Sequence, residues 1–228
     1  MRRLALALFA LLSATSAHAV DQYIFGFSNT NAGNGLIVNG GPSLSFLDQG
    51  WYFQGGQHIP TNPNYIVGNC TSCALSGEYR NWFAFDLSNL TGPVTSATLR
   101  LFSYDVTLTS GNYYLNDFTG SVASLIGGTG GVSAFTDLGS GINFGFRFYQ
   151  SSESNQFHML DLNAGALASL NAAITSGQDL WAIGGSFAAG SVPVPPTPPS
   201  TGVPEPATLA LAGLGLGLAG LMSRRRRR

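Results

Sequence analysis

Apolar and polar side chains alternate residue by residue through the middle of the chain. Two segments show this most clearly, Asn81–Leu87 and Ala97–Phe102. In the first, Phe83, Phe85 and Leu87 share one face of an extended strand. Because successive side chains of a strand point to opposite faces, this spacing predicts half-buried β-strands. The turn-rich break between the segments predicts that they pair as antiparallel strands of one sheet.

The same alternation recurs along the chain between turns rich in glycine, asparagine and serine. The chain contains 30 glycines, which suits a protein with many turns. Many short strands separated by turns predict a mainly β fold, an antiparallel β-sandwich with a jelly-roll-like arrangement. The further apolar sets are Tyr23, Phe25 and Phe27; Ile142, Phe144, Phe146 and Phe148; His158, Leu160 and Leu162; and Leu180–Ile183.

One segment departs from this pattern. Between Asn163 and Ser176, the apolar residues Leu167, Leu170 and Ile174 recur at helical spacing. Asn163 is suited to cap the start of a helix, and the following glycine to end it. The sequence therefore predicts one short helix across an end of the sandwich.

The N-terminal 19 residues have the three parts of a secretion signal. Arginines follow Met1, the stretch Leu4–Leu12 is apolar throughout, and the small residues Ala17 and Ala19 flank a cleavage point. Nine apolar residues are too few for a membrane anchor, which needs about 20. We expect a signal helix that the Sec translocon receives and that signal peptidase removes, so that the mature chain begins near Val20.

The C-terminal end has a second ordered set of elements. A proline-rich linker, residues 191–203, precedes the triplet Pro204, Glu205 and Pro206 and an uncharged apolar segment, Ala207–Met222. As a helix this segment measures roughly 24 Å at about 1.5 Å per residue, close to the thickness of a bilayer core. We expect a transmembrane helix that a terminal arginine run holds on the cytoplasmic side. The run consists of Arg224, Arg225, Arg226, Arg227 and Arg228.

This tail resembles the PEP-CTERM sorting signal, in which a Pro-Glu-Pro triplet, here after Val203, precedes a short helix and terminal arginines. The resemblance implies processing by an exosortase, a membrane-embedded protease or transpeptidase of bacteria that make exopolysaccharide. It also implies an exported protein that is anchored in the inner membrane before processing, and that afterwards stays at the cell surface or becomes extracellular. The predicted organisation is a signal peptide (1–19), a β-sandwich ectodomain (20–190), a linker (191–203) and a sorting tail (204–228).

A second resemblance lies in the ectodomain. The stretch Glu78–Ser88, continued by Val94–Leu101, is similar to jelly-roll modules of bacterial surface proteins. It implies a fold more than a function, because one fold hosts many functions.

The net charge of −1 conceals an acidic ectodomain, because most of the arginines lie at the termini and the chain has no lysine. Between residues 20 and 190, three arginines stand against ten carboxylates, a net charge of −7. Binding to nucleic acid depends on basic side chains that neutralise phosphates. Nucleic acid is therefore not an expected partner.

Two cysteines, Cys70 and Cys73, form a C-x-x-C pair. In an oxidising compartment we expect a small structural disulfide. Free thiols and a redox or metal role are the alternatives, but zinc requires two more ligands, and only His58 and His158 remain in the ectodomain. We expect no metal and no cofactor.

The sequence gives little support for catalysis. It has no G-x-S-x-G nucleophile motif, and the carboxylates Glu78 and Asp86 have no evident reason to converge as a glycosidase pair. We expect them to pair instead with Arg80 and Arg100. The predicted protein is not an enzyme, and a hydrolase is the least favoured interpretation.

Aromatic residues are the strongest indication of binding. Trp51 and Tyr52, next to glycines, are candidate glycan contacts if their rings are exposed. The favoured function is a structural or adhesive component of the envelope or biofilm. The alternative is a carbohydrate-binding module acting on exopolysaccharide.

Overall fold

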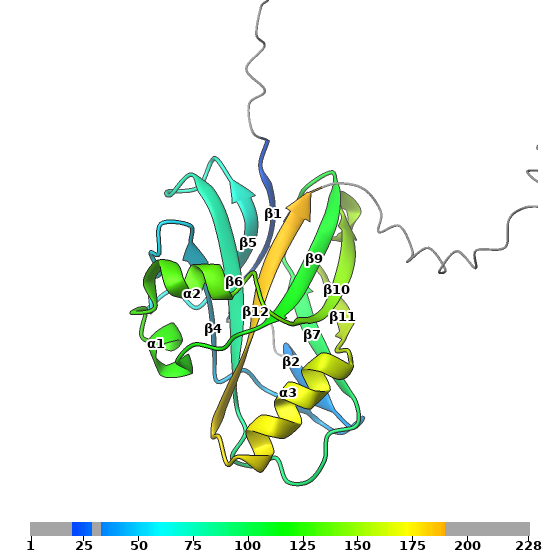
Figure 1. The fold of residues 1–228 in the computed structure, drawn as a ribbon. Coiled ribbons are helices and arrows are strands. Elements are labelled where there is room, and N and C mark those ends of the chain that lie inside the picture. Colours follow the sequence, from blue (N-terminus) through cyan, green and yellow to red (C-terminus); the bar gives the residue numbers. More distant parts are fainter. Residues whose placement is uncertain (1–19, 29–32, 190–228) are drawn as a thin grey trace, which may run out of the picture. The chain divides into compact units, whose positions relative to one another are not determined.

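The computed structural model describes residues 20–28 and 33–189. Figure 1 shows these residues as a folded β-rich domain with helices packed against the strands. The predicted signal helix with Ala17 and Ala19 lies outside the described residues. The linker, the sorting motif, the predicted transmembrane helix and the arginine run lie outside them as well. Within the described part, no helix is long and apolar enough to cross a membrane.

The strands in chain order are β1 (Gln22–Gly26), β2 (Gly35–Val38), β3 (Ser43–Leu44), β4 (Asp48–Phe53), β5 (Tyr65–Cys70), β6 (Gly77–Asp86), β7 (Ala97–Ser103), β8 (Asp105–Thr107), β9 (Ser110–Asp117), β10 (Asn143–Gln150), β11 (Gln156–Asp161) and β12 (Leu180–Ala189). The helices are α1 (Val122–Ile126), α2 (Gly131–Asp137) and α3 (Ala164–Thr175), with a 3-10 turn, η1 (Ser151–Glu153).

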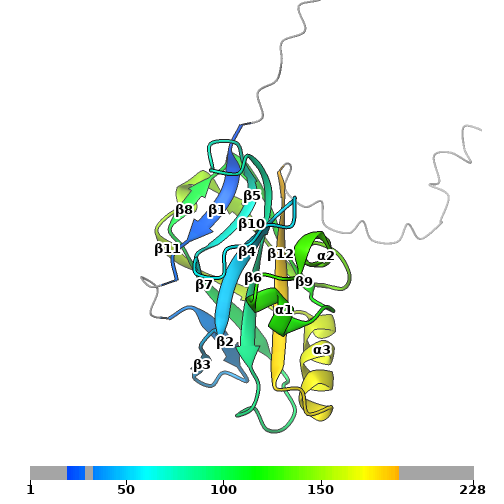
Figure 2. The ribbon, with the colours of Figure 1, turned by 90° about the vertical axis from the view of Figure 1, so that its left-hand side faces the viewer.

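The strands form two antiparallel sheets. The eight-stranded sheet has the order β10-β9-β12-β6-β5-β1-β8, and β4 joins it by pairing with β6. The four-stranded sheet has the order β11-β7-β2-β3. Figure 2 shows α1 and α2 against the first sheet on the side away from the second sheet, and α3 near one end of the strands. The buried residues of α3 belong to the core between the sheets. The prediction of a mainly β chain with antiparallel sheets is confirmed, whereas the jelly-roll-like connection stays a prediction.

A hydrophobic core fills the space between the sheets. Phe83 and Phe85 of β6 pack in one cluster with Leu99 and Leu101 of β7, and all four side chains are at most 1% exposed. Along β7, buried and partly exposed residues alternate without exception, as the sequence pattern predicts. The alternating residues therefore point into a core that both sheets share.

The predicted pairing of the first two segments is wrong. Strand β6 belongs to the eight-stranded sheet, where it pairs with β4, β5 and β12, whereas β7 pairs with β2 and β11 in the other sheet. The connection between β6 and β7 crosses from one sheet to the other. Asn171 of α3 holds it there, since its amide accepts from the Val94 N–H and donates to the Val94 carbonyl, both at 2.8 Å.

The predicted face of β10 is also only partly correct. Phe144 is fully buried, but Phe146 is 52% exposed and Tyr149 is buried in its place. The pairing with β9 shifts between Asn143 and Gly145. Such a bulge moves all later side chains to the opposite face. Glycine at position 145 permits the bulge for two reasons. Its φ of 148° is one that other residues rarely adopt, and the Asp161 carbonyl oxygen lies where a side chain would begin.

The predicted helix is confirmed as α3. The Asn163 side chain caps it by accepting from the Ala166 N–H at 3.1 Å, and Gly177 follows the helix at φ 68°. Two further helices, α1 and α2, were not predicted. They cover the outer face of the eight-stranded sheet, where Leu125 and Phe135 pack against Trp82.

Candidate binding surface

The outward face of the four-stranded sheet carries large apolar side chains at positions where polar ones are usual. In β11, Phe157 is 38% and Met159 48% exposed. The alternate residues of the same strand, His158 and Leu160, are buried. In β7, Arg100 and Phe102 point to this same outward face, because they pair with Met159 and Phe157. An antiparallel sheet with one solvated face normally presents polar residues there.

The rings on this face touch one another. The centroids of Phe102 and Phe157 lie 5.0 Å apart in an edge-to-face arrangement. The guanidinium carbon of Arg100 lies over the Phe157 ring, 3.9 Å from its centroid, and Arg100 Nη1 donates to the Gly33 carbonyl at 3.1 Å. These contacts hold the side chains in place against solvent.

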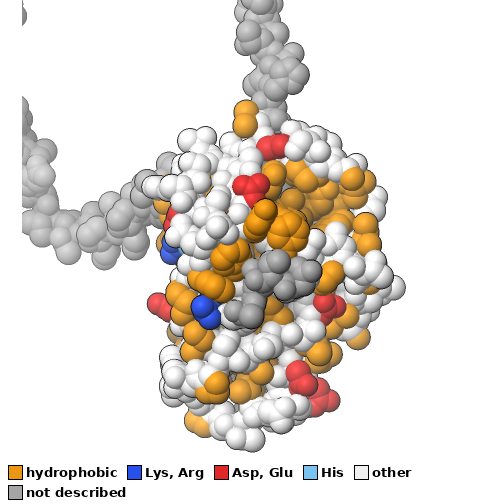
Figure 3. Space-filling view, turned by 180° about the vertical axis from the view of Figure 1, so that it is seen from behind, with side chains coloured by type: hydrophobic (Ala, Val, Ile, Leu, Met, Phe, Trp, Pro, Cys, Tyr) orange, Lys and Arg blue, Asp and Glu red, His pale blue; other side chains and the backbone are white. Residues whose placement is uncertain are grey.

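A second group of rings follows where β7 ends. Tyr104 is 49% exposed, and its ring centroid lies 4.7 Å from that of Phe27, which lies 4.7 Å from that of Phe25. The Tyr104 N–H donates to the Phe25 carbonyl at 2.9 Å, which fixes β1 beside this group. Seen from behind the view of Figure 1, hydrophobic side chains gather in several groups on this face (Figure 3). We call six residues the aromatic band: Phe25, Phe27, Phe102, Tyr104, Phe157 and Met159.

The carboxylates near the band have partners within the fold. Asp161 accepts from the Thr98 hydroxyl at 2.8 Å, and Asp105 accepts from the Thr107 hydroxyl at 3.0 Å and the Tyr23 hydroxyl at 3.4 Å. Arg100 is the charged group in direct contact with the rings. The band is therefore a mainly apolar surface with one guanidinium along its side.

The predicted glycan contacts Trp51 and Tyr52 lie elsewhere, in the interior. Trp51 is 7% exposed and Tyr52 is fully buried. The Tyr52 hydroxyl donates to the Leu125 carbonyl at 3.1 Å and accepts from the Gly130 N–H at 3.2 Å. The Tyr52 ring thus holds the short helices on the sheet, whereas Trp51 packs with Ile66, Cys70 and Tyr79, and neither ring presents a face to a sugar.

Cys70 and Cys73 are joined by a disulfide. The loop between them is tied to the start of the domain by Asp21, whose carboxylate accepts hydrogen bonds from Ser72 and Thr71. These hydrogen bonds, the one from the Ser72 side chain foremost, lower the pKa of Asp21 to about 2. The pair therefore lies in a loop with a structural role in holding β1.

The predicted ion pairs divide into one correct and one wrong pair. Arg80 Nε lies 3.0 Å from the Glu78 carboxylate. Asp86 instead accepts from the Ser88 N–H at 2.8 Å, while Arg100 lies over Phe157. The physical reason is the sheet assignment, since Asp86 and Arg100 belong to different sheets.

The histidines do not form a recognisable catalytic group. His58 stacks on Tyr52 with ring centroids 5.0 Å apart, and burial lowers its pKa, while burial raises the pKa of nearby Asp48. His158 is 3% exposed and contacts Glu153. Within residues 20–28 and 33–189, no three His, Cys, Asp or Glu side chains gather to hold a metal ion.

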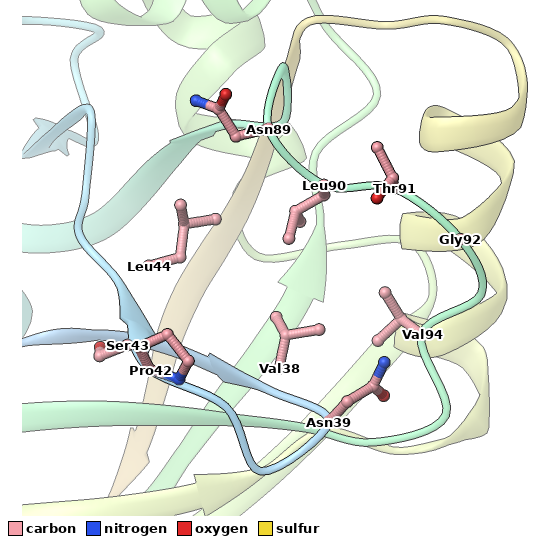
Figure 4. Close-up of a pocket in the computed structure, with 10 residues that line it drawn as sticks. All are labelled: Val38, Asn39, Pro42, Ser43, Leu44, Asn89, Leu90, Thr91, Gly92 and Val94. Atoms are coloured by element: carbon pink, nitrogen blue, oxygen red, sulfur yellow. The ribbon is translucent and has the colours of Figure 1, made fainter.

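A shallow hollow of about 330 Å³ lies between the turn after β2 and the connection from β6 to β7. Figure 4 shows Val38, Leu44 and Leu90 pointing into it, whereas Asn89 points away. The Asn39 amide on its rim is occupied, since its oxygen accepts from the Thr95 and Ser96 N–H groups. The lining of the hollow mixes apolar side chains with the polar residues Asn39, Ser43, Asn89 and Thr91. The aromatic band is the stronger candidate because it exposes large aromatic rings.

The sequence pattern used to select binding residues, large aromatic side chains beside glycines, pointed to Trp51 and Tyr52 and not to the band. Its signal was present in the alternating strands themselves: Phe102 occupies the position where Thr98 and Arg100 mark the solvent face of β7. In β11, Phe157 and Met159 similarly flank the buried His158. A large apolar residue on the polar side of an alternating strand is the pattern that indicates such a surface.

Comparison with known proteins identifies the class of protein to which this domain is attached. Residues 202–228 match the PEP-CTERM protein-sorting motif. The chain is thus an exported protein that an exosortase sorts, and it carries a β-rich domain consistent with a surface ectodomain. The motif implies membrane anchoring before cleavage and a place at the cell surface afterwards. A search of curated proteins finds no match to this chain.

The matched region contains the predicted sorting residues Val203, Pro204, Glu205 and Pro206, and it extends through the arginine run to the last residue. The match rests on sequence alone, since this tail lies outside the described residues.

Proposed function

We propose that the exported domain is a non-catalytic adhesive component of the cell envelope or biofilm matrix. The observation that supports this most directly is the aromatic band. Tyr104, Phe157 and Met159 keep between 38% and 49% of their surface exposed, on a face that a freely soluble domain would cover with polar groups. A sorted surface protein meets its partners outside the cell, where such a face is available to bind them.

The use of the ionisable side chains within the fold supports a non-catalytic role. Glu78 pairs with Arg80, Glu153 pairs with Arg147, and Asp137 accepts from the Thr119 and Gly120 N–H groups. Each of these three carboxylates has a partner within the fold. A hydrolase instead needs an acid or base whose pKa suits the reaction and which reaches the substrate.

The second candidate function is a carbohydrate-binding module that acts on exopolysaccharide. It is favoured by the same band, because exposed aromatic rings supply the apolar and polarisable contact that sugar rings use. On this reading the matrix polymer itself is the partner of the adhesive domain, so the two functions share one surface.

The adhesion test compares two sets of three substitutions. Tyr104→Ser, Phe157→Ser and Met159→Ser remove the exposed part of the band. Val132→Ser, Ile142→Ser and Phe146→Ser remove three side chains of similar exposure, 52–56%, that lie in α2, in β10 and just before β10. Cells that carry each variant are assayed for the fraction of the protein retained in the matrix and for attachment to a surface.

We expect the band variant to lose most of its retention, while the control variant behaves as the parent. Circular dichroism of both purified variants checks that they remain folded. Equal retention of the band variant and the parent would rule out adhesion through this surface.

A further inference from the structure

We infer that Met159 is the site at which oxidants modify the exported domain, and that its conversion to methionine sulfoxide weakens binding through the aromatic band. This inference rests on the proposed adhesive function and adds a chemical control of the same surface. The observations that support it are the distribution of sulfur in the chain, the exposure of Met159 and the neighbours of Met159 in the sheet.

The ectodomain contains a single thioether. Of the three methionines of the chain, Met1 lies in the predicted signal peptide and Met222 in the sorting tail, so Met159 is the one methionine between residues 20 and 190. Both cysteines of the chain are joined in a disulfide. An oxidant that attacks reduced sulfur in the ectodomain therefore has one side chain to react with.

Met159 is open to solvent, whereas the three tryptophans, whose indole rings are also oxidisable, are buried. The Met159 side chain is 48% exposed on the outward face of β11, the edge strand of the four-stranded sheet. Trp51, Trp82 and Trp181 are at most 7% exposed. Because susceptibility to oxidation follows exposure, oxidation of the folded domain should be concentrated at Met159.

The reaction transfers one oxygen atom to sulfur. A hydroperoxide outside the cell, such as hydrogen peroxide, supplies the oxygen. A lone pair of Sδ forms the S–O bond, the O–O bond breaks, and water leaves once a proton has moved to the departing oxygen. Sulfur loses two electrons and the peroxide gains them. The product, methionine sulfoxide, is polar where the thioether was apolar.

The neighbours of Met159 belong to the aromatic band or contact it. Met159 pairs with Arg100 of β7, and Phe157 lies two positions earlier on the same face of β11. Opposed residues of an antiparallel pair have Cβ atoms about 4.5–5.5 Å apart. Arg100 packs over the Phe157 ring and donates through Nη1 to the Gly33 carbonyl, so further N–H donors remain for a sulfoxide oxygen. Oxidation therefore places a polar group beside the rings and gives their guanidinium neighbour a new acceptor.

The experiment uses the protein as cells release it, treated with hydrogen peroxide and compared with its own untreated sample. Intact mass measures the oxygen taken up, and peptide mapping locates it. The fraction of protein that binds to matrix from cells lacking this protein measures adhesion. Circular dichroism before and after treatment verifies that the fold is kept.

Two variants serve as controls. Met159→Leu keeps an apolar side chain of similar volume but forms no sulfoxide. Adding Val132→Met to this variant moves the thioether away from the band. Val132 is 56% exposed and lies in α2, which covers the outer face of the eight-stranded sheet.

We expect the parent to take up one oxygen atom at Met159 and its binding to the matrix to fall severalfold. Methionine sulfoxide reductases should restore the binding. Peroxide should leave Met159→Leu at its own untreated level. The variant with the thioether in α2 should take up oxygen there without losing binding.

Uptake of oxygen at other side chains in place of Met159 would overturn the inference. Unchanged binding of a fully oxidised parent would do the same, as would an equal loss of binding when Met159→Leu is treated with peroxide.

The triple variant Tyr104→Ser, Phe157→Ser and Met159→Ser, tested in the same assay, separates this inference from the adhesive function. If the triple variant binds less than the parent while oxidation has no effect, only the inference about Met159 fails. If the triple variant binds as the parent does, the adhesive function fails, and the inference fails with it.

Discussion

The imidazole Nε2 of His158 lies 3.0 Å from the backbone carbonyl oxygen of Glu153, and its Nδ1 lies 3.9 Å from the carboxylate of the same residue. Glu153 belongs to η1, which connects β10 of the eight-stranded sheet to β11 of the four-stranded sheet. The Arg147 guanidinium and the Tyr149 ring also face this site. The histidine thus lies at a corner where the two sheets are joined.

The burial of His158 at this corner predicts that the folded protein becomes less stable as the pH is lowered. Burial, aided by Arg147, lowers the pKa of His158 below its ordinary value, although Glu153 acts in the opposite direction. The unfolded chain therefore binds the proton more readily than the folded one. The stability that the fold gains from a neutral His158 is fully present above about pH 6.5, the pKa of histidine in the unfolded chain. It is lost as the pH falls through the lower pKa of His158 in the folded protein. Melting temperatures between pH 7.5 and 5 measure it.

The control for the acid effect is His158→Gln, which cannot take up the proton. We expect a flatter dependence of the melting temperature on pH in this variant than in the parent. Some slope should remain, since burial also lowers the pKa of His58. Parallel curves for parent and variant would show that His158 is not responsible.

The shared core predicts a large effect of one truncation in β7. Leu99 is fully buried between the sheets. Leu99→Ala should lower the free energy of unfolding by about 2–5 kcal/mol, because it removes buried methyl groups and leaves a cavity. Met159→Ala, on the exposed face of the adjacent strand, should change it by about 0.5 kcal/mol or less. Urea denaturation measures both, and similar losses would argue against this placement of the faces.

Loss of the disulfide should lower the free energy of unfolding by less than the largest losses expected for Leu99→Ala. Cys70 and Cys73 are three positions apart, so their bond closes a short loop and restricts the unfolded chain only modestly. Replacing both with serine should cost about 2 kcal/mol, the size expected from chain entropy for so short a loop. A reducing agent should destabilise the parent by a similar amount and leave the double variant unaffected. A parent insensitive to reduction would contradict this prediction.

The sorting motif predicts a defect in processing. With Pro204, Glu205 and Pro206 replaced by alanine, most of the protein should remain uncleaved in the inner membrane, because the exosortase no longer meets its motif. Cell fractionation and intact mass measure the product. The matched control replaces Pro198 and Pro199 of the linker with alanine and should be processed as the parent is. Normal release of the motif variant would refute the role of the triplet.

The sequence predicted the strands β1, β6, β7, β10, β11 and β12 because their alternation is local. It could not predict the sheet to which each strand belongs. β6 and β7 are neighbours in the chain, yet contacts from distant residues, Asn171 in α3 and Asn39 after β2, hold their connection across the sandwich. Hydrogen bonds between residues so far apart in sequence leave no periodic signal.

Other differences have local causes that a periodic pattern does not contain. The bulge at Gly145 reverses the faces of β10 with a single residue. Helices α1 and α2 have five and seven residues, too few for a helical period to be recognised. Among the candidate site residues, Trp51 and Tyr52 were chosen for their residue type and their neighbouring glycines. Their burial is decided by residues distant in sequence, the short helices for Tyr52 and Ile66, Cys70 and Tyr79 for Trp51.

Strand β12 ends at Ala189, and the sorting motif follows it in the chain. Under the proposed adhesive function, a pull on the chain beyond this strand enters the domain along β12. β12 is paired on both sides, with β6 over Leu180–Gly185 and with β9 over Ile183–Ala189. Tension parallel to β12 acts on all of its hydrogen bonds to β6 and β9 at the same time. Tension perpendicular to the strand would break these hydrogen bonds one after another. The strand at which such a load would enter is therefore hydrogen-bonded along both of its edges, which suits the proposed adhesive function.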